Sequence, residues 1–429
     1  MSPEKLTWRD ILSNRRLAVV ALLGFASGLP LALTTGTLQA WATVAGVDIV
    51  SIGFLTLVGQ AYVFKFLWAP LLDRYVPPFL GRRRGWMLIA QIALIIGIAA
   101  MGLLDPGEKL MPIALVAVMV AFFSATQDIA VDAYRTDVLK PAERGLGAAL
   151  GVGGYRLAMI VSGAMALAIA QRAGWQTTYF LMAALMLIGV FTTFVAPDPV
   201  EQKPPASLLK AVVEPFFEFL TRNGIRVGIA FLILIVLYKL GDAFALSLTT
   251  PFLLRGMDFT LTDVAVVNKM MGLVATIVGV FAGGVVIARV GLFWSLFWFG
   301  VLQAVTNLGF MIMSTMDKSY WILVTVIGLE NLAGGMGTAA FVAFLMALCD
   351  HRYTATQFAL LSALAVIGRV YVGPAAGVMV DSMGWTPFYL FTFIVAWPGV
   401  IMLWFMRRWI LPLDDNMDDS RAGAEANGA

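Results

Sequence analysis

Nine ionisable side chains stand inside long apolar stretches of this 429-residue chain. They are Lys65, Asp128, Asp132, Arg156, Lys239, Asp242, Lys269, Glu330 and Arg369. A charge at the centre of a bilayer costs about 2.5–3.5 kcal/mol on insertion scales, so such residues face protein or a water-filled cavity. Carboxylates that take up a proton, together with cations that bind an anion, would suit ion-coupled transport across a membrane.

The acidic residues of the first half lie on one predicted helix. Asp128, Asp132 and Arg135 share a helix face because they are spaced by four and three residues. Asp128 is the first candidate for proton coupling, next to the amide of Gln127; the alternative is a salt bridge to a neighbouring helix. Asp132 and Arg135 lie nearer the cytoplasmic end, where proton coupling by Asp132 and a gating ion pair are both open.

Two further carboxylates mark the second half. Lys239 and Asp242 are three residues apart, so they either neutralise one another or form a switch in which protonation of Asp242 frees Lys239 for an anion. Glu330 precedes Asn331 and the glycine-rich stretch 334–337, which permits bending or close helix contact. Glu330 is the second candidate proton site; the alternative is a structural hydrogen bond to a neighbouring span.

The five cations outnumber the four carboxylates among these nine residues, which favours an anionic substrate. Salt bridges that open and close between two parts of the protein are the alternative. Aromatic side chains nearby could stack on sugar rings; they are Tyr62, Trp68, Tyr155, Tyr238 and Tyr371. The candidate substrate-binding residues are Lys65, Gln127, Tyr155, Arg156, Tyr238, Lys239, Lys269, Asn331 and Arg369.

Composition identifies the environment of these residues. The chain is 60% hydrophobic and 13% charged, whereas a soluble domain carries about 25% charged residues. This excludes a nucleic-acid binder and a disordered scaffold. A lone cysteine, Cys349, and a lone histidine, His351, argue against a disulfide framework and a multi-His metal centre. We therefore expect an all-α integral membrane protein with no metal and no cofactor other than the coupling proton.

Apolar stretches long enough to cross a bilayer predict twelve transmembrane helices. The predicted spans are 17–44, 51–74, 85–104, 111–139, 143–171, 175–196, 226–254, 262–289, 293–314, 319–349, 354–382 and 386–409. The expected layout is a cytoplasmic segment 1–16, a six-helix bundle 17–196, a linker 197–225, a second bundle 226–409 and a disordered tail 410–429. Apolar residues at helical spacing from Leu208 to Leu220 predict a surface helix in the linker.

The distribution of Lys and Arg predicts the orientation. With both termini in the cytoplasm, cytoplasmic segments hold 20 of the 29 basic residues. The outer loops hold four: Lys109, Arg172, Arg255 and Lys318. This bias supports an even number of spans with both termini inside.

The two halves resemble one another. Thr34-Thr35 and Asp48 recur 215 residues later, and a Gly-Trp-x-x-x-Tyr motif at 174–179 recurs at 384–389. Two pseudo-symmetric six-helix halves joined by a cytoplasmic linker resemble the major facilitator superfamily. The nine charges avoid spans 3, 6, 9 and 12, which are the outer supports in that layout.

Two local sequences agree with that layout. The segment 73–84 resembles the superfamily's loop between helices 2 and 3, which latches the cytoplasmic side; anchoring by positive charge is the alternative. The candidate gate residues are Asp73, Arg74, Arg82, Arg83 and Arg135. Gly24-x-x-x-Gly28, followed by Pro30, predicts a close helix contact and a kink in span 1.

A more specific resemblance extends from residue 17 to 405. The sequence is similar to the bacterial muropeptide permease family in the strings that begin at Gly24 (GFASGLPLALT), Gly59 (GQAYVFKFLW), Gly81 (GRRRGW), Tyr238 (YKLGDAFA), Val267 (VNK), Glu330 (EN), Gly334 (GGMGT) and Ala355 (ATQFALLSAL). The resemblance implies proton-driven import of N-acetylglucosaminyl-1,6-anhydro-N-acetylmuramyl peptides across the bacterial inner membrane. It also implies roles in peptidoglycan recycling and in signalling for β-lactamase induction.

Other classes are open to test. A related transporter of another anionic substrate, such as acetyl-CoA, a peptide or a drug, is the alternative within the superfamily. A membrane enzyme would need long loops with clustered acids or metal ligands, and the outer loops here are short. We therefore expect a transporter and not an enzyme. Its expected partners are the anhydromuropeptide, protons and membrane lipids, without nucleic acid, and it is expected to work as a monomer.

Overall fold

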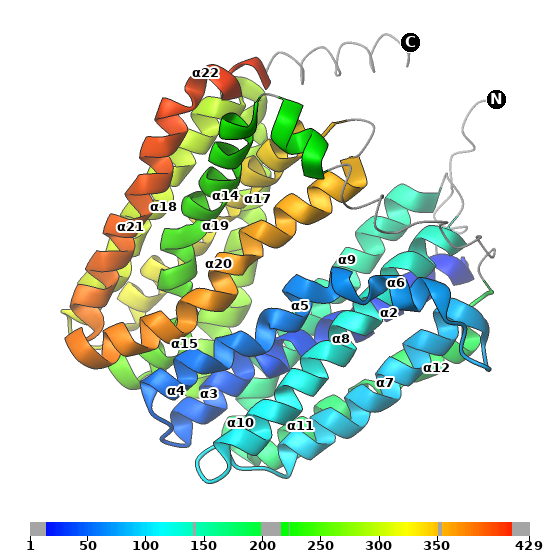
Figure 1. Cartoon of the computed structure of the whole chain (residues 1–429). Helices are drawn as coiled ribbons and strands as arrows, with labels where there is room; N and C mark the ends of the chain where they lie inside the picture. Colours follow the sequence, from blue (N-terminus) through cyan, green and yellow to red (C-terminus); the bar gives the residue numbers. More distant parts are fainter. Residues whose placement is uncertain (1–13, 140–142, 199–215, 223, 351–353, 414–429) are drawn as a thin grey trace. The chain divides into compact units, whose positions relative to one another are not determined.

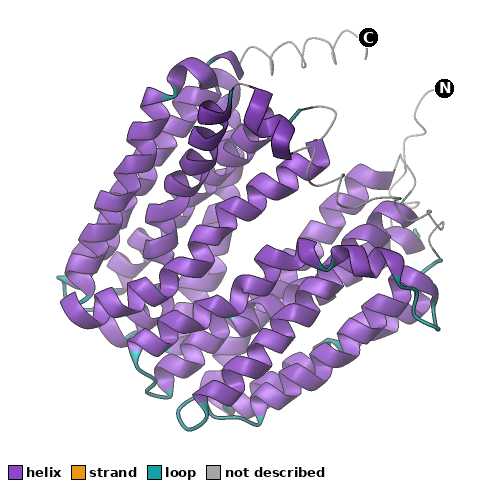
Figure 2. Ribbon diagram, in the orientation of Figure 1, coloured by secondary structure: helices purple, strands orange, loops and turns teal. Residues whose placement is uncertain are grey.

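The computed structural model describes residues 14–139, 143–198, 216–222, 224–350 and 354–413. Within these ranges the regular structure is entirely helical (Figure 2). Twelve helices in this part of the chain are long and apolar enough to cross a membrane, which confirms the predicted number. In the first half they are Arg15–Val44, Ile49–Leu67, Gly81–Gly102, Leu110–Val138, Leu150–Ala173 and Trp175–Val195. In the second half they are Ile225–Gly256, Leu261–Val290, Leu292–Ser314, Tyr320–Ala347, Leu360–Met383 and Trp385–Phe405.

Packing divides the chain into two compact units. Unit 1 comprises residues 1–48, 57–206 and 260–265; unit 2 comprises residues 49–56, 207–259 and 266–429. The longer helices of unit 1 are α2 (Arg15–Thr34), α3 (Gly36–Val44), α7 (Gly81–Gly102), α8 (Leu110–Val138), α9 (Arg144–Ile160), α10 (Ala166–Ala173), α11 (Trp175–Leu185) and α12 (Leu187–Val195). Those of unit 2 are α14 (Ile225–Ser247), α17 (Gly272–Val290), α18 (Leu292–Ser314), α19 (Tyr320–Ala347), α20 (Thr354–Met383) and α21 (Trp385–Phe405), with the short α4 (Ile49–Phe54), as labelled in Figure 1.

Span 2 is broken, unlike the continuous span 51–74 predicted from hydropathy. After α4 it passes through a 3₁₀ turn η1 (Leu55–Gly59), α5 (Gln60–Phe64) and a second 3₁₀ turn η2 (Lys65–Leu67). A separate short helix, α6 (Ala69–Arg74), then starts with proline in its first turn. Proline lacks the amide that would continue the preceding helix, so hydropathy alone joined two elements. The break places Lys65 in a turn.

Both halves interrupt their first span at the repeated threonine pair. α2 ends at Thr34 and α3 begins at Gly36, while α14 ends one residue before Leu248 and α15 (Thr249–Pro251) follows. Threonine hydroxyls satisfy carbonyls beside each break: Thr35 Oγ1 donates to Leu31 O at 2.7 Å and Thr249 Oγ1 to Ala245 O at 2.9 Å. Such breaks are tolerated in membrane helices where local side chains satisfy the backbone.

The Gly-Trp-x-x-x-Tyr repeat forms the turn into the last span of each half. Gly174 and Gly384 both have φ of +81°, a backbone conformation that favours glycine. In unit 1 Trp175 then stacks on Trp41 with ring centroids 5.4 Å apart. In unit 2 Trp385 packs on Phe252 at 5.2 Å. The repeat is therefore structural: one residue turns the chain and the ring anchors the next span.

Glycine brings neighbouring spans into backbone contact within each unit. In unit 1 a Cβ on Gly24 would lie 2.2 Å from Gly151 O, and one on Gly154 would lie 2.1 Å from Ala21 O. This confirms the close contact predicted for span 1, and its partner is α9. In unit 2 a Cβ on Gly335 would lie 2.2 Å from Thr276 O on α17. α19 is helical through Gly335 without a break, so this glycine serves close contact and not bending.

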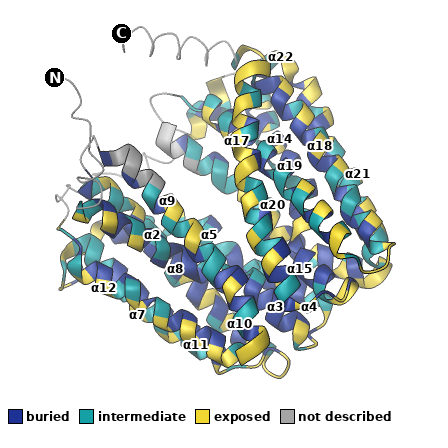
Figure 3. Cartoon of the chain, turned by 180° about the vertical axis from the view of Figure 1, so that it is seen from behind, coloured by how far each residue is buried: buried dark blue, intermediate teal, exposed yellow. Residues whose placement is uncertain are grey.

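Large apolar side chains remain on the outer surfaces of the spans. Trp321, Phe405 and Phe281 are 81%, 74% and 73% exposed. Figure 3 shows exposed residues running along helices whose opposite faces are buried. A soluble protein would not expose rings of this size so widely, whereas lipid accepts them. The surface therefore agrees with a multi-pass membrane protein.

Part of the predicted linker helix is described. Residues 216–222 are helical, and Arg222 Nη1 donates to Leu348 O at 3.0 Å. Glu218 accepts from Arg222 Nε at 2.8 Å and from Gln357 Nε2 at 2.6 Å. The hydrogen bond from Arg222 holds the pKa of Glu218 below its usual value. This network ties the helix to unit 2; the rest of the predicted helix, including Leu208, lies outside the described residues.

Candidate functional site

Asp128 is the centre of a polar cluster in unit 1. It lies on α8 and accepts a hydrogen bond from Ser27 Oγ on α2. Lys65 in η2 is close enough to act on it electrostatically. Tyr62 on α5 and Tyr155 on α9 also lie within its electrostatic reach. Spans 1, 2, 4 and 5 thus bring three predicted site residues, Lys65, Asp128 and Tyr155, into one neighbourhood.

Gln127, the predicted amide binder, is fully buried beside this cluster. Neither its amide oxygen nor its amide nitrogen has a hydrogen-bond partner among the described residues. The hydroxyls of Tyr62 and Ser124 share that property. A buried polar group without a partner costs about 1–3 kcal/mol. Retaining three such groups near one carboxylate fits a site that binds polar molecules.

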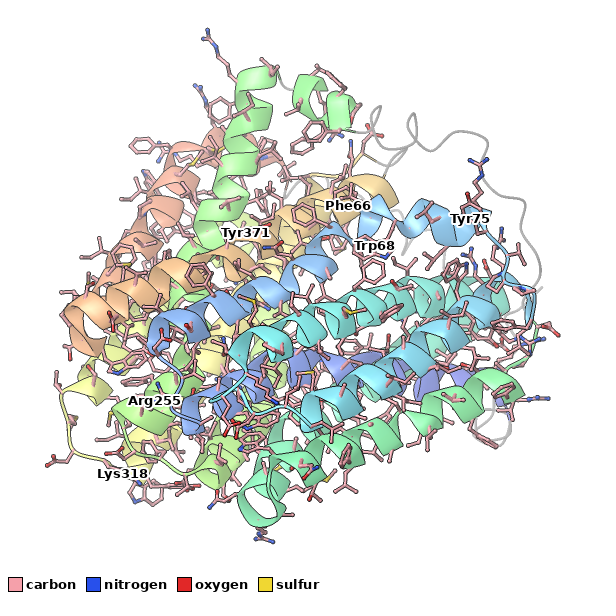
Figure 4. All side chains as sticks on the ribbon, turned by 60° about the horizontal axis from the view of Figure 1, so that its bottom comes forward. Phe66, Trp68, Tyr75, Arg255, Lys318 and Tyr371 are labelled. Atoms are coloured by element: carbon pink, nitrogen blue, oxygen red, sulfur yellow. The ribbon has the colours of Figure 1, made fainter. Side chains whose placement is uncertain are left out.

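An aromatic side chain borders the same region. Trp68, labelled in Figure 4, donates Nε1 to Thr126 Oγ1 at 3.1 Å. Its ring lies on Phe122 with centroids 4.9 Å apart. Trp68 is therefore held by packing in unit 1. In unit 2, Tyr371 is 42% exposed and keeps an accessible ring (Figure 4).

The predicted gate residues of unit 1 pair differently from one another. Arg135 bonds Asp132 on its own helix at 3.1 Å. Arg83 instead reaches Asp137 near the end of α8, with 3.0 Å between Nε and Oδ2. Sequence reasoning missed Asp137, although its position one turn beyond Asp132 and Arg135 was a signal. The Arg83–Asp137 pair ties the start of span 3 to the end of span 4.

The remaining gate candidates are less defined. Arg74 is exposed at the end of α6, and Arg82 lies at the start of α7 in a partly buried position. The side chain of Asp73 lies outside the described ones. Their gating role stays a prediction.

Unit 2 holds a denser charge cluster. Lys239 Nζ lies 3.4 Å from Asp242 Oδ2 one turn along α14. Asp242 also accepts from Gln303 Nε2 on α18. Glu330 on α19 and Arg369 on α20 act electrostatically on this pair. Four predicted residues are thus brought together, and Gln303 completes the set; it was missed because span 9 carries no charge.

Glu330 is nearly fully buried, at 2% exposure, and its Oε2 has no partner in the described part of the chain. The adjacent Asn331 is committed to packing: its Nδ2 donates to Ile327 O at 2.8 Å, and its Oδ1 accepts from Thr276 Oγ1 at 3.1 Å. Asn331 therefore joins spans 8 and 10.

Tyr238 likewise has a structural environment. Its hydroxyl donates to Leu296 O at 2.8 Å and its ring stacks on Phe341 at 5.4 Å. The ring faces the core of unit 2, so its hydroxyl is occupied within the protein. Of the two other cations of unit 2, Lys269 donates to Thr250 Oγ1 at 3.2 Å and Arg369 is exposed.

Arg156 differs from the other cations of unit 1. It is exposed on α9, and its Nη1 approaches only Met159 Sδ, at 3.8 Å. No carboxylate lies within ion-pair distance among the described residues. A guanidinium in this state can bind a carboxylate of another molecule in bidentate fashion. Among the described residues, no group of three His, Cys, Asp or Glu could hold a metal ion.

The twelve spans, the broken first helix of each half and the buried charges define a secondary transporter, and comparison with known proteins gives the family. A sequence model of the Major Facilitator Superfamily matches residues 20–370, and the chain belongs to that superfamily. It is 55% identical to the anhydromuropeptide permease of Escherichia coli (strain K12), over 93% of this chain and 81% of that protein. Within the superfamily it therefore belongs to the anhydromuropeptide permease family.

Other relatives agree with this placement. An uncharacterized protein of Haemophilus influenzae is 39% identical over 93% of this chain and 95% of its own length. The nucleoside transporter NupG superposes with a TM-score of 0.70 at 17% identity, covering 92% of this chain and 99% of that one. A POT family transporter superposes with a TM-score of 0.72 at 11% identity, covering 92% and 96%. These structures show the shared fold. The protein is a multi-pass membrane transporter and not an enzyme.

Proposed function

We propose that this protein imports N-acetylglucosaminyl-1,6-anhydro-N-acetylmuramyl peptides from the periplasm to the cytoplasm in symport with protons. Identity of 55% to a permease named for anhydromuropeptides supports the substrate class. The observation that carries the coupling is the presence of a buried carboxylate near a cation in each unit. Buried charge is costly in a membrane and is retained where ions or substrates pass.

The cations suit the peptide part of this substrate. Muropeptides carry carboxylates, and the unpaired guanidinium of Arg156 offers the bidentate geometry that carboxylates accept. Gln127 offers an unpaired amide for sugar hydroxyls or acetamido groups. The exposed ring of Tyr371 can stack on a sugar face.

The carboxylates carry the proton in this proposal. Asp128 is the first site, because its hydrogen-bond donor is the neutral hydroxyl of Ser27 and it can be protonated without leaving a cation unpaired at hydrogen-bonding distance. Transport then follows alternating access: substrate and proton bind from outside, the two halves rearrange, and both leave inside. The protein works as a monomer in the bacterial inner membrane with both termini in the cytoplasm.

This activity places the protein in peptidoglycan recycling, upstream of β-lactamase induction where such signalling exists. The direct test is uptake of labelled anhydrodisaccharide peptide into proteoliposomes with and without an inward proton gradient. We expect accumulation only with the gradient. Competition by unlabelled muropeptide but not by acetyl-CoA, other peptides or drugs supports the substrate; competition by one of these at equal concentration favours the related-transporter alternative.

A further inference from the structure

Five buried polar atoms of unit 2 have no hydrogen-bond partner among the described residues. They are Gln303 Oε1, Asn307 Oδ1, Asn307 Nδ2, Glu330 Oε2 and Tyr389 OH. The four residues are at most 3% exposed. Buried polar groups in proteins are almost always satisfied, by protein or by ordered water. Five in one unit therefore point to bound water.

The packing of α18 on α19 places these atoms in order. A Cβ on Gly337 would lie 2.1 Å from Gln303 Oε1, so Gln303 faces Gly337. A Cβ on Gly309 would lie 3.2 Å from Val326 Cγ1, so Gly309 faces Val326. The two helices therefore run antiparallel. Asn307, between 303 and 309, is level with the stretch of α19 that contains Glu330.

Both ends of this row meet residues already described. At one end Gln303 Nε2 donates to Asp242. At the other end Tyr389 stacks on Phe310 with centroids 5.1 Å apart, and its hydroxyl lies within electrostatic reach of Glu330. The row thus runs from one carboxylate of the charge cluster to the other.

Glycine at 337 is required for this arrangement. Any side chain there would collide with the Gln303 amide, whose oxygen would lie 2.1 Å from the new Cβ. Gly335 serves a different purpose, because its Cβ would meet Thr276 O on α17. At Gly334 a Cβ would meet nothing within 4 Å. The glycine-rich stretch of span 10 therefore makes room for an amide at one position and for a helix at another.

We propose that this row, called here the polar column (Gln303, Asn307, Glu330 and Tyr389), binds water that connects Asp242 to Glu330. An ordered water needs two to four polar partners, and the column offers donors and acceptors for that purpose. Each water that accepts a proton from one neighbour donates one to the next, so one proton passes with no net change in the column. The consequence for transport rests on the proposed proton symport; the water site does not.

Charged groups around the column belong to the same cluster. Lys239 lies on the helix of Asp242, and Arg369 approaches from α20. With a proton shared between Asp242 and Glu330, the two carboxylates would load as one site. Unit 2 would then hold a proton delocalised over two spans instead of at a single side chain.

Radiolytic hydroxyl labelling tests the water directly, because radicals formed from bound water oxidise adjacent side chains even when they are buried. Tyr179 is the matched control: it is the repeat equivalent of Tyr389 and equally buried, at 0% exposure, but its hydroxyl donates to Leu33 O at 2.9 Å. We expect Tyr389 to be oxidised at least tenfold faster than Tyr179 in the folded protein. Equal protection of the two tyrosines would overturn the proposal.

Asn307→Leu tests the connection. With folding verified by the thermal transition, it should lower oxidation of Tyr389 towards the rate of Tyr179 and reduce gradient-driven accumulation at least tenfold while exchange persists. Accumulation at the wild-type level would overturn the link between the two carboxylates. If wild-type protein shows no gradient-driven uptake, the proposed symport fails, and the labelling of Tyr389 still decides whether the column is hydrated.

Discussion

The two halves share backbone devices but differ in how they hold charge. Both break the first span at a Thr-Thr pair and turn into the last span at a glycine with φ of +81°. In unit 1, however, Asp128 accepts from a neutral hydroxyl, whereas in unit 2 Asp242 is bound by Lys239 and an amide. The repeat therefore preserved the scaffold and not the chemistry, which suggests that the two carboxylate sites have different tasks.

The first prediction tests Asp128, where we expect the largest effect. Asp128→Asn keeps the size of the side chain and its bond to Ser27 but cannot take up a proton. Gradient-driven uptake in proteoliposomes should fall roughly 100-fold, while exchange of labelled for unlabelled substrate persists. Asp132→Asn is the control, since Asp132 is exposed and pairs with Arg135 on its own helix. Wild-type accumulation by the Asp128 variant would remove it as the proton site.

The second prediction tests the ion pair of unit 2. The side chains of Lys239 and Asp242 are 17% and 12% exposed, so Asp242→Leu leaves a largely buried cation. We expect unfolding to become easier by about 3–5 kcal/mol, measured as a lower thermal transition in detergent. Lys239→Met combined with Asp242→Leu should recover most of that loss. A double variant as unstable as the single one would show that Asp242 stabilises through Gln303 alone.

The third prediction concerns helix contact in the two units. Gly154→Ala in unit 1 and Gly335→Ala in unit 2 each place a Cβ within 2.2 Å of a backbone oxygen. Both should destabilise by about 1–3 kcal/mol, because packed backbones must separate. Gly334→Ala is the matched control: its Cβ meets nothing within 4 Å. We expect that variant to be neutral or more stable by up to about 1 kcal/mol.

The fourth prediction compares exposed arginines of the two units. Arg156→Ala and Arg369→Ala should weaken binding of peptide-bearing substrate roughly tenfold, the loss of one charge-assisted hydrogen-bonded pair. Binding of the disaccharide without peptide should change little. Titration of both ligands against purified protein measures this. Equal losses for the two ligands would favour a gating role for these arginines.

The smallest expected effect concerns the linker helix 216–222. Because Arg222 lowers the pKa of Glu218 in the folded protein, their interaction stabilises above the ordinary carboxyl pKa of 4.5. It is lost as pH falls below that value through the lowered pKa. Hydrogen exchange of residues 216–222 should therefore increase, relative to the rest of unit 2, only at such acidic pH. Glu218→Gln should abolish this pH dependence; an unchanged profile would show that the ion pair does not hold the helix.

Much of the fold could be predicted from sequence, because hydrocarbon demands long apolar helices and forces charges into the protein interior. Lys239, Asp242 and Glu330 could be grouped for that reason. Neutral partners could not: Gln303 and Asn307 carry no charge, and nothing in the sequence of span 9 distinguishes them from packing residues. Asn331 and Tyr238 were selected by type, whereas their hydrogen bonds within unit 2 depend on packing that a single sequence does not reveal.

The broken second span shows a second limit. Hydropathy averages over a window, so it joined α5, η2 and α6 into one element. The proline that begins α6 was the local signal. The Gly-Trp-x-x-x-Tyr repeat gives the opposite case: a pattern of two rings and a glycine was enough to pair the halves, because positive φ and ring stacking depend on residue type.

The central claim, that muropeptide and protons move together through this protein, is tested most directly by recording pH and substrate at once. Anhydromuropeptide added to proteoliposomes without an imposed gradient should drive protons inward, seen as alkalinisation outside, with the wild-type protein and not with Asp128→Asn. Uptake of labelled substrate by the wild-type protein with no accompanying change in external pH would contradict the account.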